Sequence, residues 1–382
     1  MREEQTYTGR RVTSRVRRDG HVELTLADSR VGPPGPDEVV VRVEATPINP
    51  SDLGLLLAGA DPASARPVRD ASDPTTVLEL PPGAGDNLGG RLEQALPVGN
   101  EGAGTVVAAG DGARDLLGRL VSCAGGGMWT EYRLVPAENC LVLEPGTPVR
   151  DAAAGFVNPM TVLALVETAR RDGHTALVHT AAASNLGQML LRACLADGIG
   201  LVAVVRSDEQ ADLLRSLGAE HVCDSSADDF TDQLRDAIAE TGATVAFDAV
   251  GGGPLAGQIL RAMEAVSRAD AQAYSLYGSS VRKQVHVYGR LDPRPLEVDL
   301  SIGLAWQVGG WLLTNFLREL TPKDVGRMRT RVATELTTTF ASTYGAEISL
   351  PDVLSPEAIA GYARRGTGQK YLIAPHGPTR HA

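Results

Sequence analysis

The sequence predicts an α/β protein in which a doubly wound parallel sheet is inserted into a β-barrel-like domain. Three observations support this prediction. The chain has 382 residues, which is too long for one ordinary core and fits two domains. Short apolar runs broken by Gly and Pro fill the region from about Val22 to Arg150. Beyond Arg150, apolar runs alternate with helical segments rich in Ala and Leu.

The first region predicts antiparallel strands in a compact β-barrel-like domain. Its apolar runs are VELTLADS, DEVVVRVEAT, GTVVAAG, RLVSCAG and EYRLVPAENCLVLEPG. The stretch between Asp61 and Leu96 is rich in Pro, Ala, Asp and Gly and has no clear period. We expect a loop of this length to be a functional lid or a disordered segment.

The second region predicts a parallel sheet with helices on both faces. Its strand candidates are TALVHT, LVAVVR, HVCD, ATVAFDAV and QVHVYGRL. Near the end, the run KYLIA needs a sheet to join, so we expect the tail to return to the first domain. The predicted domains are therefore 1–152, 153–314 and 315–382, the last rejoining the first.

Composition and charge exclude several classes of function. A hydrophobic fraction of 43%, with 22% charged residues, is typical of a globular protein. The formal charge of -11, without a dense Lys/Arg run, would repel a phosphate backbone, so we expect no nucleic-acid partner. The four cysteines are scattered without a C-x-x-C pair, and we interpret each as a small buried hydrophobe.

No targeting or membrane segment is predicted. The first twenty residues contain basic side chains but lack the apolar core of a secretory signal, so we expect a cytoplasmic protein. No apolar run approaches the roughly 20 residues that cross a bilayer. The nearest candidate, Ile302 to Phe316, is interpreted as a buried strand and turn.

A turn of small residues predicts a dinucleotide site. The strand TALVHT leads into the segment from Ala181 to Gly187, which precedes a helix. Ala181, Ser184 and Gly187 form a degraded G-x-x-G-x-x-G pattern, whose small residues let backbone N–H groups approach a pyrophosphate. The predicted cofactor contacts in this turn are Ala181, Ala183, Ser184, Asn185, Leu186 and Gly187.

The next strand predicts which dinucleotide is bound. It ends at Arg206 and Ser207, where an NAD enzyme would carry an acidic residue for the ribose 2′-OH. Arg206 therefore favours NADPH, the alternative being a solvated arginine at a strand end. Asp208 and Glu209 suit the first turn of the following helix.

Two later strands also end in candidate cofactor residues. One closes at Val250 and Gly251, the other at Tyr288 and Gly289. Ligands of doubly wound sheets lie beyond the carboxyl ends of the strands. We expect these glycines to leave room for the nicotinamide half.

Several motifs, in this order, resemble the medium-chain dehydrogenase/reductase superfamily, in its quinone oxidoreductase-like branch without zinc. They are INPSD (48–52), VGNEGAGTV (98–106), EYRLVPA, VNPMT (157–161), AAASNLG, LGAEHV, FDAVGG, YGRL and TGQKYLI, and they span nearly the whole chain. The resemblance implies a GroES-like catalytic domain built from both chain ends. It also implies a Rossmann domain between them, an active site in the cleft, and a homodimer formed through edge strands of the Rossmann sheets.

The resemblance also implies that no metal is bound. Zinc-dependent relatives carry a Cys near the INPSD segment and a His in a GHE motif, whereas this chain has Ile48, Asn49 and Asn100 there. Catalytic zinc requires three Cys, His or carboxylate ligands. Without a Lewis acid, hydride addition to a quinone or an enone is favoured over alcohol oxidation.

NPMT and the segment from Gly310 to Leu313 are similar to 2-enoyl thioester reductases of the same superfamily. By that similarity Asn158 and Thr161 contact the nicotinamide or its ribose. The remaining cofactor residues implied are Tyr288 to Leu291, Trp311, Leu312, Leu313 and Lys370. The tyrosine that those reductases use near the substrate falls at Ala60, which leaves the proton donor unidentified.

Asn49 and Asn158 are the candidate catalytic residues, as hydrogen-bond donors to the developing oxyanion. Asn49 alternatively caps a turn ahead of Pro50. Asp52 is interpreted as a structural carboxylate with no reason for a raised pKa. Glu101 is expected to hold the two domains together, and His179 to be a satisfied histidine under the cofactor. Trp306, Trp311 and Phe316 either line the pocket or pack a subunit interface.

The sequence therefore predicts a zinc-independent, NADPH-dependent oxidoreductase that passes hydride to a quinone or an enone. One alternative is a 2-enoyl thioester reductase. An alternative of another class is a non-catalytic NADPH-binding sensor or structural protein.

Overall fold

The computed structural model describes residues 5–269, 271, 274–364 and 366–377. The chain divides into two compact units, one made of Met1–Val157 and Arg329–Ala382 and the other of Asn158–Met328. We call them the β-rich unit and the α/β unit. The boundaries expected from the sequence were 152/153 and 314/315, whereas the structure has them at 157/158 and 328/329. The second boundary lies later than expected because α8 (Leu313–Glu319) and half of α9 (Pro322–Glu335) belong to the α/β unit.

The β-rich unit contains a five-stranded sheet of order β4-β5-β2-β1-β6 and a seven-stranded sheet of order β10-β8-β7-β3-β18-β17, on which β9 also pairs with β3. All pairings are antiparallel except β17 with β18. The strands are β1 (Tyr7–Val16), β2 (His21–Val31), β3 (Glu38–Pro47), β4 (Arg66–Pro67), β5 (Thr75–Glu79), β6 (Leu96–Pro97), β7 (Glu101–Ala109), β8 (Leu120–Ala124), β9 (Tyr132–Pro136), β10 (Cys140–Val142), β17 (Ala346–Ser349) and β18 (Tyr371–Ala374). The α-helices are α1 (Pro50–Leu57), α2 (Val149–Ala152) and α10 (Pro356–Ala363), and the 3-10 helices are η1 (Pro62–Ser64), η2 (Ala84–Arg91), η3 (Asp111–Leu116), η4 (Ala137–Asn139) and η5 (Pro351–Leu354).

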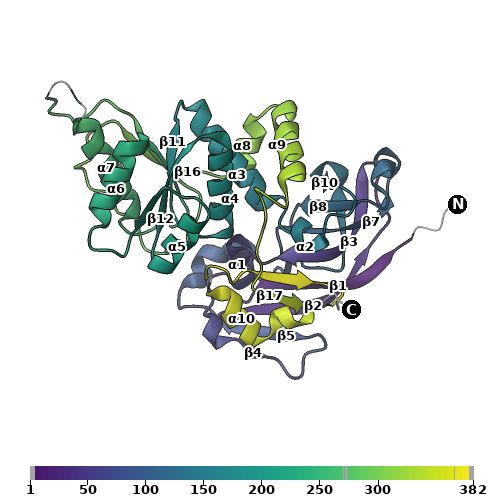
Figure 1. The fold of residues 1–382 in the computed structure, drawn as a ribbon. Helices are drawn as coiled ribbons and strands as arrows, with labels where there is room; N and C mark the ends of the chain where they lie inside the picture. Colours follow the sequence, from purple (N-terminus) through teal and green to yellow (C-terminus); the bar gives the residue numbers. More distant parts are fainter. Residues whose placement is uncertain (1–4, 270, 272–273, 365, 378–382) are drawn as a thin grey trace. The chain divides into compact units, whose positions relative to one another are not determined.

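Both ends of the chain build the β-rich unit. Thr46 in β3 pairs with Ile373 in β18, and β18 pairs in turn with β17. The two segments, purple and yellow in Figure 1, therefore share one sheet. The prediction that the KYLIA run returns to the first domain is confirmed.

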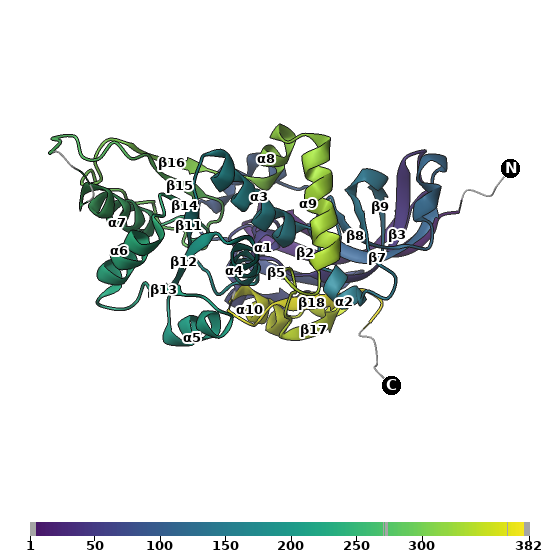
Figure 2. The ribbon, with the colours of Figure 1, turned by 45° about the horizontal axis from the view of Figure 1, so that its top comes forward.

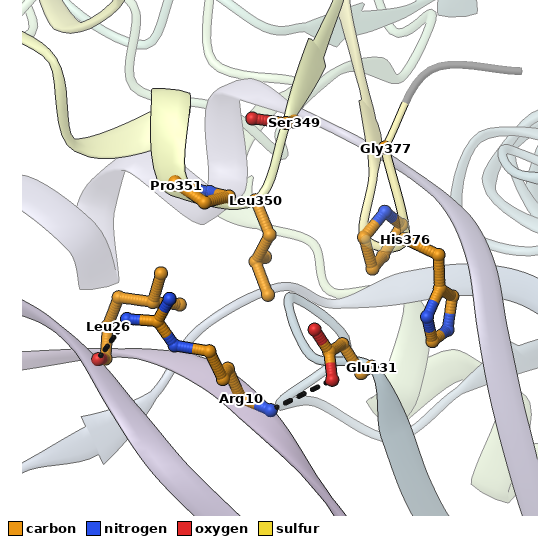
Figure 3. Close-up of a pocket in the computed structure, with 9 residues that line it drawn as sticks. Arg10, Leu26, Glu131, Ser349, Leu350, Pro351, His376 and Gly377 are labelled. Atoms are coloured by element: carbon orange, nitrogen blue, oxygen red, sulfur yellow. Dashed lines mark hydrogen bonds between the residues drawn. The ribbon is translucent and has the colours of Figure 1, made fainter. Parts of the chain in front are cut away.

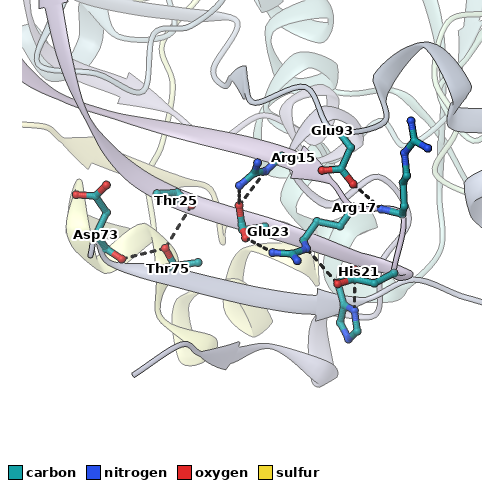
Figure 4. Close-up of polar contacts among 10 residues, drawn as sticks. Arg15, Arg17, His21, Glu23, Thr25, Asp73, Thr75 and Glu93 are labelled. Carbon is teal, nitrogen blue, oxygen red and sulfur yellow. Dashed lines mark hydrogen bonds and ion pairs between the residues drawn. The ribbon is translucent and has the colours of Figure 1, made fainter. Parts of the chain in front are cut away.

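Alternation with period two places the core of the five-stranded sheet. Along β2, Val22, Leu24 and Leu26 are fully buried, whereas the residues between them are half-buried. The same strand directs Glu23 to the other face. There it pairs with Arg15 and Arg17, and Thr25 bonds to Thr75 (Figure 4). Exposed pairs of this kind contribute little to stability, so the apolar face holds the sheet together.

The segment from 61 to 96 was expected to be a lid or disordered, and the expectation of disorder is wrong. β5 pairs with β2 over five residues, and β4 pairs with β5. Leu78 within β5 is fully buried in the core. The short strand was missed because Pro, Gly and Asp surround it on both sides.

The α/β unit is a six-stranded, entirely parallel sheet of order β13-β12-β11-β14-β15-β16. Helices α6 and α7 lie on one face, and α3 and α4 lie on the other (Figures 1 and 2). Strands covered on both faces are typically continuous apolar runs, and the central strands β11, β12 and β14 are largely apolar and buried. The strands are β11 (Ala176–His179), β12 (Gly200–Val205), β13 (His221–Asp224), β14 (Val245–Asp248), β15 (Lys283–Val287) and β16 (Trp306–Gly310). The remaining helices are α3 (Val157–Arg171), α4 (Asn185–Asp197), α5 (Asp208–Ser216), α6 (Phe230–Thr241) and α7 (Leu255–Ala269).

The stretch from Ile302 to Phe316 differs from the prediction of a buried strand and turn. β16 lies at the edge of the sheet, and its residues are half-buried or exposed. α8 follows it directly. Within the described ranges, none of the helices combines the length and apolar character needed to cross a bilayer.

Candidate active site

The predicted dinucleotide turn connects β11 to α4 at the carboxyl edge of the parallel sheet. Ser184 is the N-cap of α4, and its side chain accepts a hydrogen bond from the Gly187 N–H at 3.1 Å. A Cβ on Gly187 would lie 2.2 Å from the Ala182 carbonyl oxygen, so only glycine permits this contact. Ala181 has φ of 51°, a left-handed conformation that favours glycine. The turn thus has the backbone geometry of a glycine-rich loop although alanine replaces a glycine.

The end of β12 carries the residues predicted to select the cofactor. Ser207 caps α5 by accepting a hydrogen bond from the Gln210 N–H, and the Arg206 N–H donates to Gln210 Oε1. Asp208 and Glu209 occupy the first turn of α5, as predicted. Arg206 is exposed, and its guanidinium has no carboxylate partner among the residues that the structure describes. Its position leaves the charge available to an anionic ligand.

The glycines after β14 and β15 pack against each other's backbone. A Cβ on Gly251 would lie 2.4 Å from the Gly289 oxygen, and one on Gly289 would lie 2.4 Å from the Ala249 oxygen. Backbone atoms fill the space that a side chain would occupy at these two positions, and the expectation that the nicotinamide half lies beyond them stays a prediction. Their missing side chains are used for close contact between two strand ends.

Sequence reasoning missed the pair that organises these strand ends. Buried Thr180 donates from Oγ1 to Asp248 Oδ1 at 2.7 Å and accepts from the Ala249 N–H. Asp248 also accepts from the N–H groups of Val250 and Gly251. The available signal was a polar residue ending each of two buried strands. Buried polar side chains need hydrogen-bond partners, and here Thr180 and Asp248 bond to one another.

His179 and Tyr288 form a second connection between strand ends. His179 Nε2 lies 2.7 Å from Tyr288 Oη, and the two rings stack at 5.9 Å. Complete burial lowers the pKa of His179 to about 3, so the ring is neutral. Its Nδ1 has no hydrogen-bond partner in the described part of the chain, so the prediction of a satisfied histidine is only half correct.

This burial predicts a pH-dependent stability. The unfolded histidine takes up a proton near pH 6.5 and the folded one near pH 3, so stability is lost as pH falls below 6.5. Between pH 7 and 5 we expect the free energy of unfolding of the wild type to fall by about 2 kcal/mol more than that of His179→Gln, whose side chain does not titrate. Urea unfolding at both pH values measures this difference. Equal losses in the two proteins would contradict the assigned neutral state.

The aromatic segment after β16 is attached to α3. Trp311 donates from Nε1 to Thr168 Oγ1 at 3.1 Å and packs edge-on against Tyr288. Leu312 is exposed and precedes α8, which begins at Leu313. The same helix α3 carries half-buried Asn158 and buried Thr161 in its first turns. The structure therefore links α3 and the segment from Trp311 to Leu313 within one unit.

Asn49 lies in the β-rich unit at the start of α1. Its side chain makes no capping bond to the helix; instead Nδ2 donates to Glu101 Oε1 at 2.8 Å. Asn49 is nevertheless the N-cap residue of α1, and its backbone N–H donates to Asp52 Oδ2, so the interpretation that it caps the turn ahead of Pro50 is confirmed. Asn49 Oδ1 is buried without a partner among the described residues, which leaves it available to a bound group.

Lys370 lies across from Asn49. Pro47 pairs with Leu372, and the Ile48 N–H donates to the Tyr371 oxygen, which continues the register to Asn49 and Lys370. Lys370 Nζ is also buried and has no hydrogen-bond partner in the described ranges. Burial lowers its pKa, an effect that the charges of Glu101 and Asp52 oppose. The unsatisfied acceptor of Asn49 and donor of Lys370 fit a polar ligand.

Two buried carboxylates support these residues. Asp52 accepts from the N–H groups of Asn49 and Asn100, at 2.7 and 2.8 Å, which confirms that it bonds to backbone. We expected no raised pKa, but burial raises the pKa of Asp52 to about 7. Glu101 accepts from the N–H groups of Phe156 and Val157, where the chain leaves the β-rich unit. Burial also raises the pKa of Glu101.

The positions of the zinc ligands in zinc-dependent relatives hold other side chains here. Ile48 is buried in the apolar core, and Asn100 donates from Nδ2 to Ser51 Oγ at 2.9 Å. Over the residues whose placement is described, His, Cys, Asp and Glu nowhere form a group of three arranged to hold a metal.

Two further cavities lie in the β-rich unit. The larger, of about 350 Å³, is bordered by Arg10, Glu131 and His376 among others (Figure 3). The smaller, of about 210 Å³, is lined by Arg11, Arg30 and Arg133 among others. Neither is lined by a residue predicted to bind the cofactor.

Comparison with protein families gives two matches. Residues 35–145 match the alcohol dehydrogenase GroES-like domain, and residues 186–268 match the zinc-binding dehydrogenase family. The chain is 29% identical over 225 residues to a mycocerosic acid synthase-like polyketide synthase of Mycolicibacterium smegmatis, covering 58% of this chain and 9% of that protein. It is 30% identical over 225 residues to the rat synaptic vesicle membrane protein VAT-1 homolog, covering 57% of this chain and 48% of that protein. It thus spans less than half the length of either relative.

Solved structures resemble nearly the whole chain. A Mesorhizobium loti protein assigned as an NADPH:quinone reductase is 25% identical, with a TM-score of 0.70, over 98% of this chain and 99% of its own. Escherichia coli quinone oxidoreductase complexed with NADPH is 18% identical, with a TM-score of 0.68, over 97% and 100%. CurK enoyl reductase is 16% identical, with a TM-score of 0.67, over 95% and 98%.

Proposed function

Because this chain belongs to the medium-chain dehydrogenase/reductase superfamily, in its quinone oxidoreductase-like branch, we propose that it binds NADPH and reduces a quinone or an enone without zinc. The observation that carries the proposal is the turn from Ala181 to Gly187 at the N-terminus of α4, with Arg206 ending the neighbouring strand. NADPH supplies the hydride when bound. The chain's own residues must hold it, orient it and stabilise the reduced substrate.

The residues present fit a dinucleotide phosphate. The first N–H groups of a helix lack intrahelical partners and attract anions, and the small residues before α4 let a pyrophosphate approach them. Gly187 keeps the helix close to the turn. Exposed Arg206 would pair with the 2′-phosphate, for which a guanidinium is well suited. Lys370 Nζ, which lies over the Tyr344 ring and has no hydrogen-bond partner in the described ranges, would donate to another polar group of the ligand.

The asparagines would act on the substrate oxygen. An amide nitrogen carries two hydrogens, and the Nδ2 of Asn49 donates one of them to Glu101. The second remains for an oxyanion that develops as hydride arrives. Asn158, in the first turn of α3, is the other donor that we propose.

The donor chemistry of the β-rich unit supports the zinc-free part of the proposal. Ile48 offers no ligand atom, and Asn49 and Asn100 offer amide groups that zinc sites rarely use. The match to the zinc-binding dehydrogenase family covers 186–268, which is entirely in the α/β unit and does not include these positions.

NADPH oxidation by a panel of quinones and enones tests the proposal, together with metal analysis of the purified protein. We expect NADPH-dependent reduction of at least one class of electrophile and less than stoichiometric zinc. Stoichiometric zinc, or a preference for NADH, would argue against the proposal.

Reduction of a 2-enoyl thioester is the second candidate, favoured by the similarity to CurK enoyl reductase and to the polyketide synthase. Against it, the position of the substrate-side tyrosine is held by Ala60, which is buried in the core and offers no proton. Turnover of crotonyl-CoA well above that of quinones would establish this candidate in place of the first.

Arg206→Ala is expected to reduce the preference for NADPH over NADH by about 10- to 100-fold, because a charged hydrogen bond contributes roughly 1.5–3 kcal/mol. kcat/KM for both cofactors measures the preference. Arg215→Ala is the matched control, since Arg215 lies at the other end of α5 and pairs with Asp212. An equal loss of kcat/KM for NADPH and NADH in Arg206→Ala would show that Arg206 does not recognise the 2′-phosphate.

We also propose a homodimer formed through the edge of the α/β sheet. β16 has a strand on one side only, and Leu300 and Leu304 nearby are 79% and 69% exposed. An exposed edge strand with apolar neighbours is a template for pairing. Light scattering should give twice the chain mass of 40.1 kDa. A mass of one chain at micromolar concentration would contradict it.

A further inference from the structure

Two of the four free cysteines face each other inside the β-rich unit. Cys123 in β8 and Cys140 in β10 are direct partners in an antiparallel pair. Their sulfur atoms are 3.5 Å apart, and both side chains are buried. The sequence separates them by many residues and has no C-x-x-C pair, so this proximity was missed.

The hydrogen-bond pattern of the pair suits a cross-strand link. The Leu143 N–H donates to the Leu120 oxygen, so Leu143 and Leu120 form a hydrogen-bonded pair. Hydrogen-bonded and non-hydrogen-bonded positions alternate, so Cys140 and Cys123, three pairs back, occupy a non-hydrogen-bonded one. There Cα atoms are about 4.5 Å apart, within the roughly 4.4–6.8 Å that a disulfide spans.

The surroundings favour reaction at Cys140. A hydrogen bond with Cys123 and the positive charge of Arg329 lower the pKa of the Cys140 thiol. Arg329 is fixed there, since it donates to the backbone oxygens of Glu138 and Cys140. Cys140 therefore has the greater thiolate character of the two.

The position of β10 provides a route for an oxidant. β10 has three residues and lies at the edge of the seven-stranded sheet, where β8 is its one partner among the described strands. Short edge strands open at low free-energy cost compared with central strands. Local opening of β10 exposes Cys140 without unfolding the unit.

We propose that Cys123 and Cys140 form a reversible intrachain disulfide when the protein meets a hydroperoxide. The Cys140 thiolate attacks the peroxide, so that an S–O bond forms and the O–O bond breaks, releasing water or an alcohol after protonation. The Cys123 thiolate then attacks the Cys140 sulfur, forming the S–S bond and releasing the second oxygen as water. Two thiols together lose two protons and two electrons, which reduce the peroxide.

The link would act beside the candidate site. Cys123 pairs across the sheet with Gly102 in β7, next to Glu101. Oxidation therefore joins the edge strand covalently to the strand that neighbours the Glu101 carboxylate. The proposal rests on the sulfur geometry, the neighbouring Arg329 and the edge position of β10, and it is independent of the proposed hydride transfer.

The test uses the full chain, reduced, freed of reductant and treated with hydrogen peroxide in the absence of denaturant. We expect the free-thiol count to fall from four to two. The mass should decrease by two hydrogen atoms, and a non-reduced digest should contain a peptide joining Cys123 to Cys140. Dithiothreitol should restore all four thiols.

Cys194→Ser is the matched control, because Cys194 lies in α4 of the other unit; it should still lose two thiols. Cys140→Ser should form no internal link, with its fold checked by thermal unfolding. The digest of the unaltered protein tests the proposal even if that variant does not fold. A link between other cysteines, oxidation of Cys140 to sulfinic acid without a link, or linkage only in urea would overturn it.

Discussion

Gly187→Ala is expected to destabilise the protein by roughly 3 kcal/mol and to abolish measurable NADPH binding. The added Cβ would lie 2.2 Å from the Ala182 oxygen and 2.6 Å from its carbonyl carbon. These are backbone atoms, so α4 must move away from the turn, and overpacking of this kind costs about 1–3 kcal/mol or more. The same movement withdraws the helix N-terminus from the pyrophosphate. Urea unfolding and a fluorescence titration with NADPH measure the two effects.

Gly326→Ala is the matched control. Gly326 lies in α9 within the same unit, is exposed, and has open space where a Cβ would be placed. Alanine is favoured over glycine in a helix interior by about 1 kcal/mol, so this variant should be as stable as the wild type or more stable. NADPH affinity retained in Gly187→Ala would show that the cofactor is not held at this turn.

Glu101→Ala is expected to lower the free energy of unfolding by about 3–5 kcal/mol, the largest loss of stability that we expect near the candidate site. The carboxylate accepts from the N–H groups of Phe156 and Val157 and from Asn49 Nδ2. Its removal leaves buried donors unsatisfied and takes a negative charge away from Lys370. Urea unfolding at pH 7 measures the cost.

Glu131→Ala is the corresponding control, since the half-buried Glu131 side chain accepts one long hydrogen bond within the described part of the chain, from the Arg10 N–H at 3.2 Å. We expect a loss of about 1 kcal/mol or less. If the two variants lose equal stability, the Glu101 network is not the strong connection described here.

Much of the fold could be predicted because its signals are local. The alternation in β2 reflects burial of one face of the strand, and the apolar runs of β11 and β12 reflect burial of both faces. Both patterns can be recognised from consecutive residues. The turn between β11 and α4, proposed to bind the dinucleotide, could be located because its small residues lie between a strand and a helix. The exceptions are instructive: β5 was hidden by its Pro- and Gly-rich flanks, and its pairing depends on β2, far away in the sequence.

The rest of the candidate site depends on contacts between distant residues. Thr180 bonds to Asp248 and His179 to Tyr288 only because β11, β14 and β15 are neighbours in the sheet. The close backbone contacts of Gly251 and Gly289 likewise depend on two strand ends that are distant in the sequence. The raised pKa of Asp52 could not be predicted either, because burial is a property of the folded unit.

The placement of one unit within the chain of the other has a consequence for synthesis on the ribosome. The segment from 158 to 328 is continuous, so it can complete its core as soon as it has emerged. The β-rich unit must wait for β18, the partner of β3, which follows the whole α/β unit in the sequence. Until then Thr46 and Pro47 at the end of β3 lack their partner strand, and slow or interrupted translation beyond residue 328 should increase aggregation of the nascent chain.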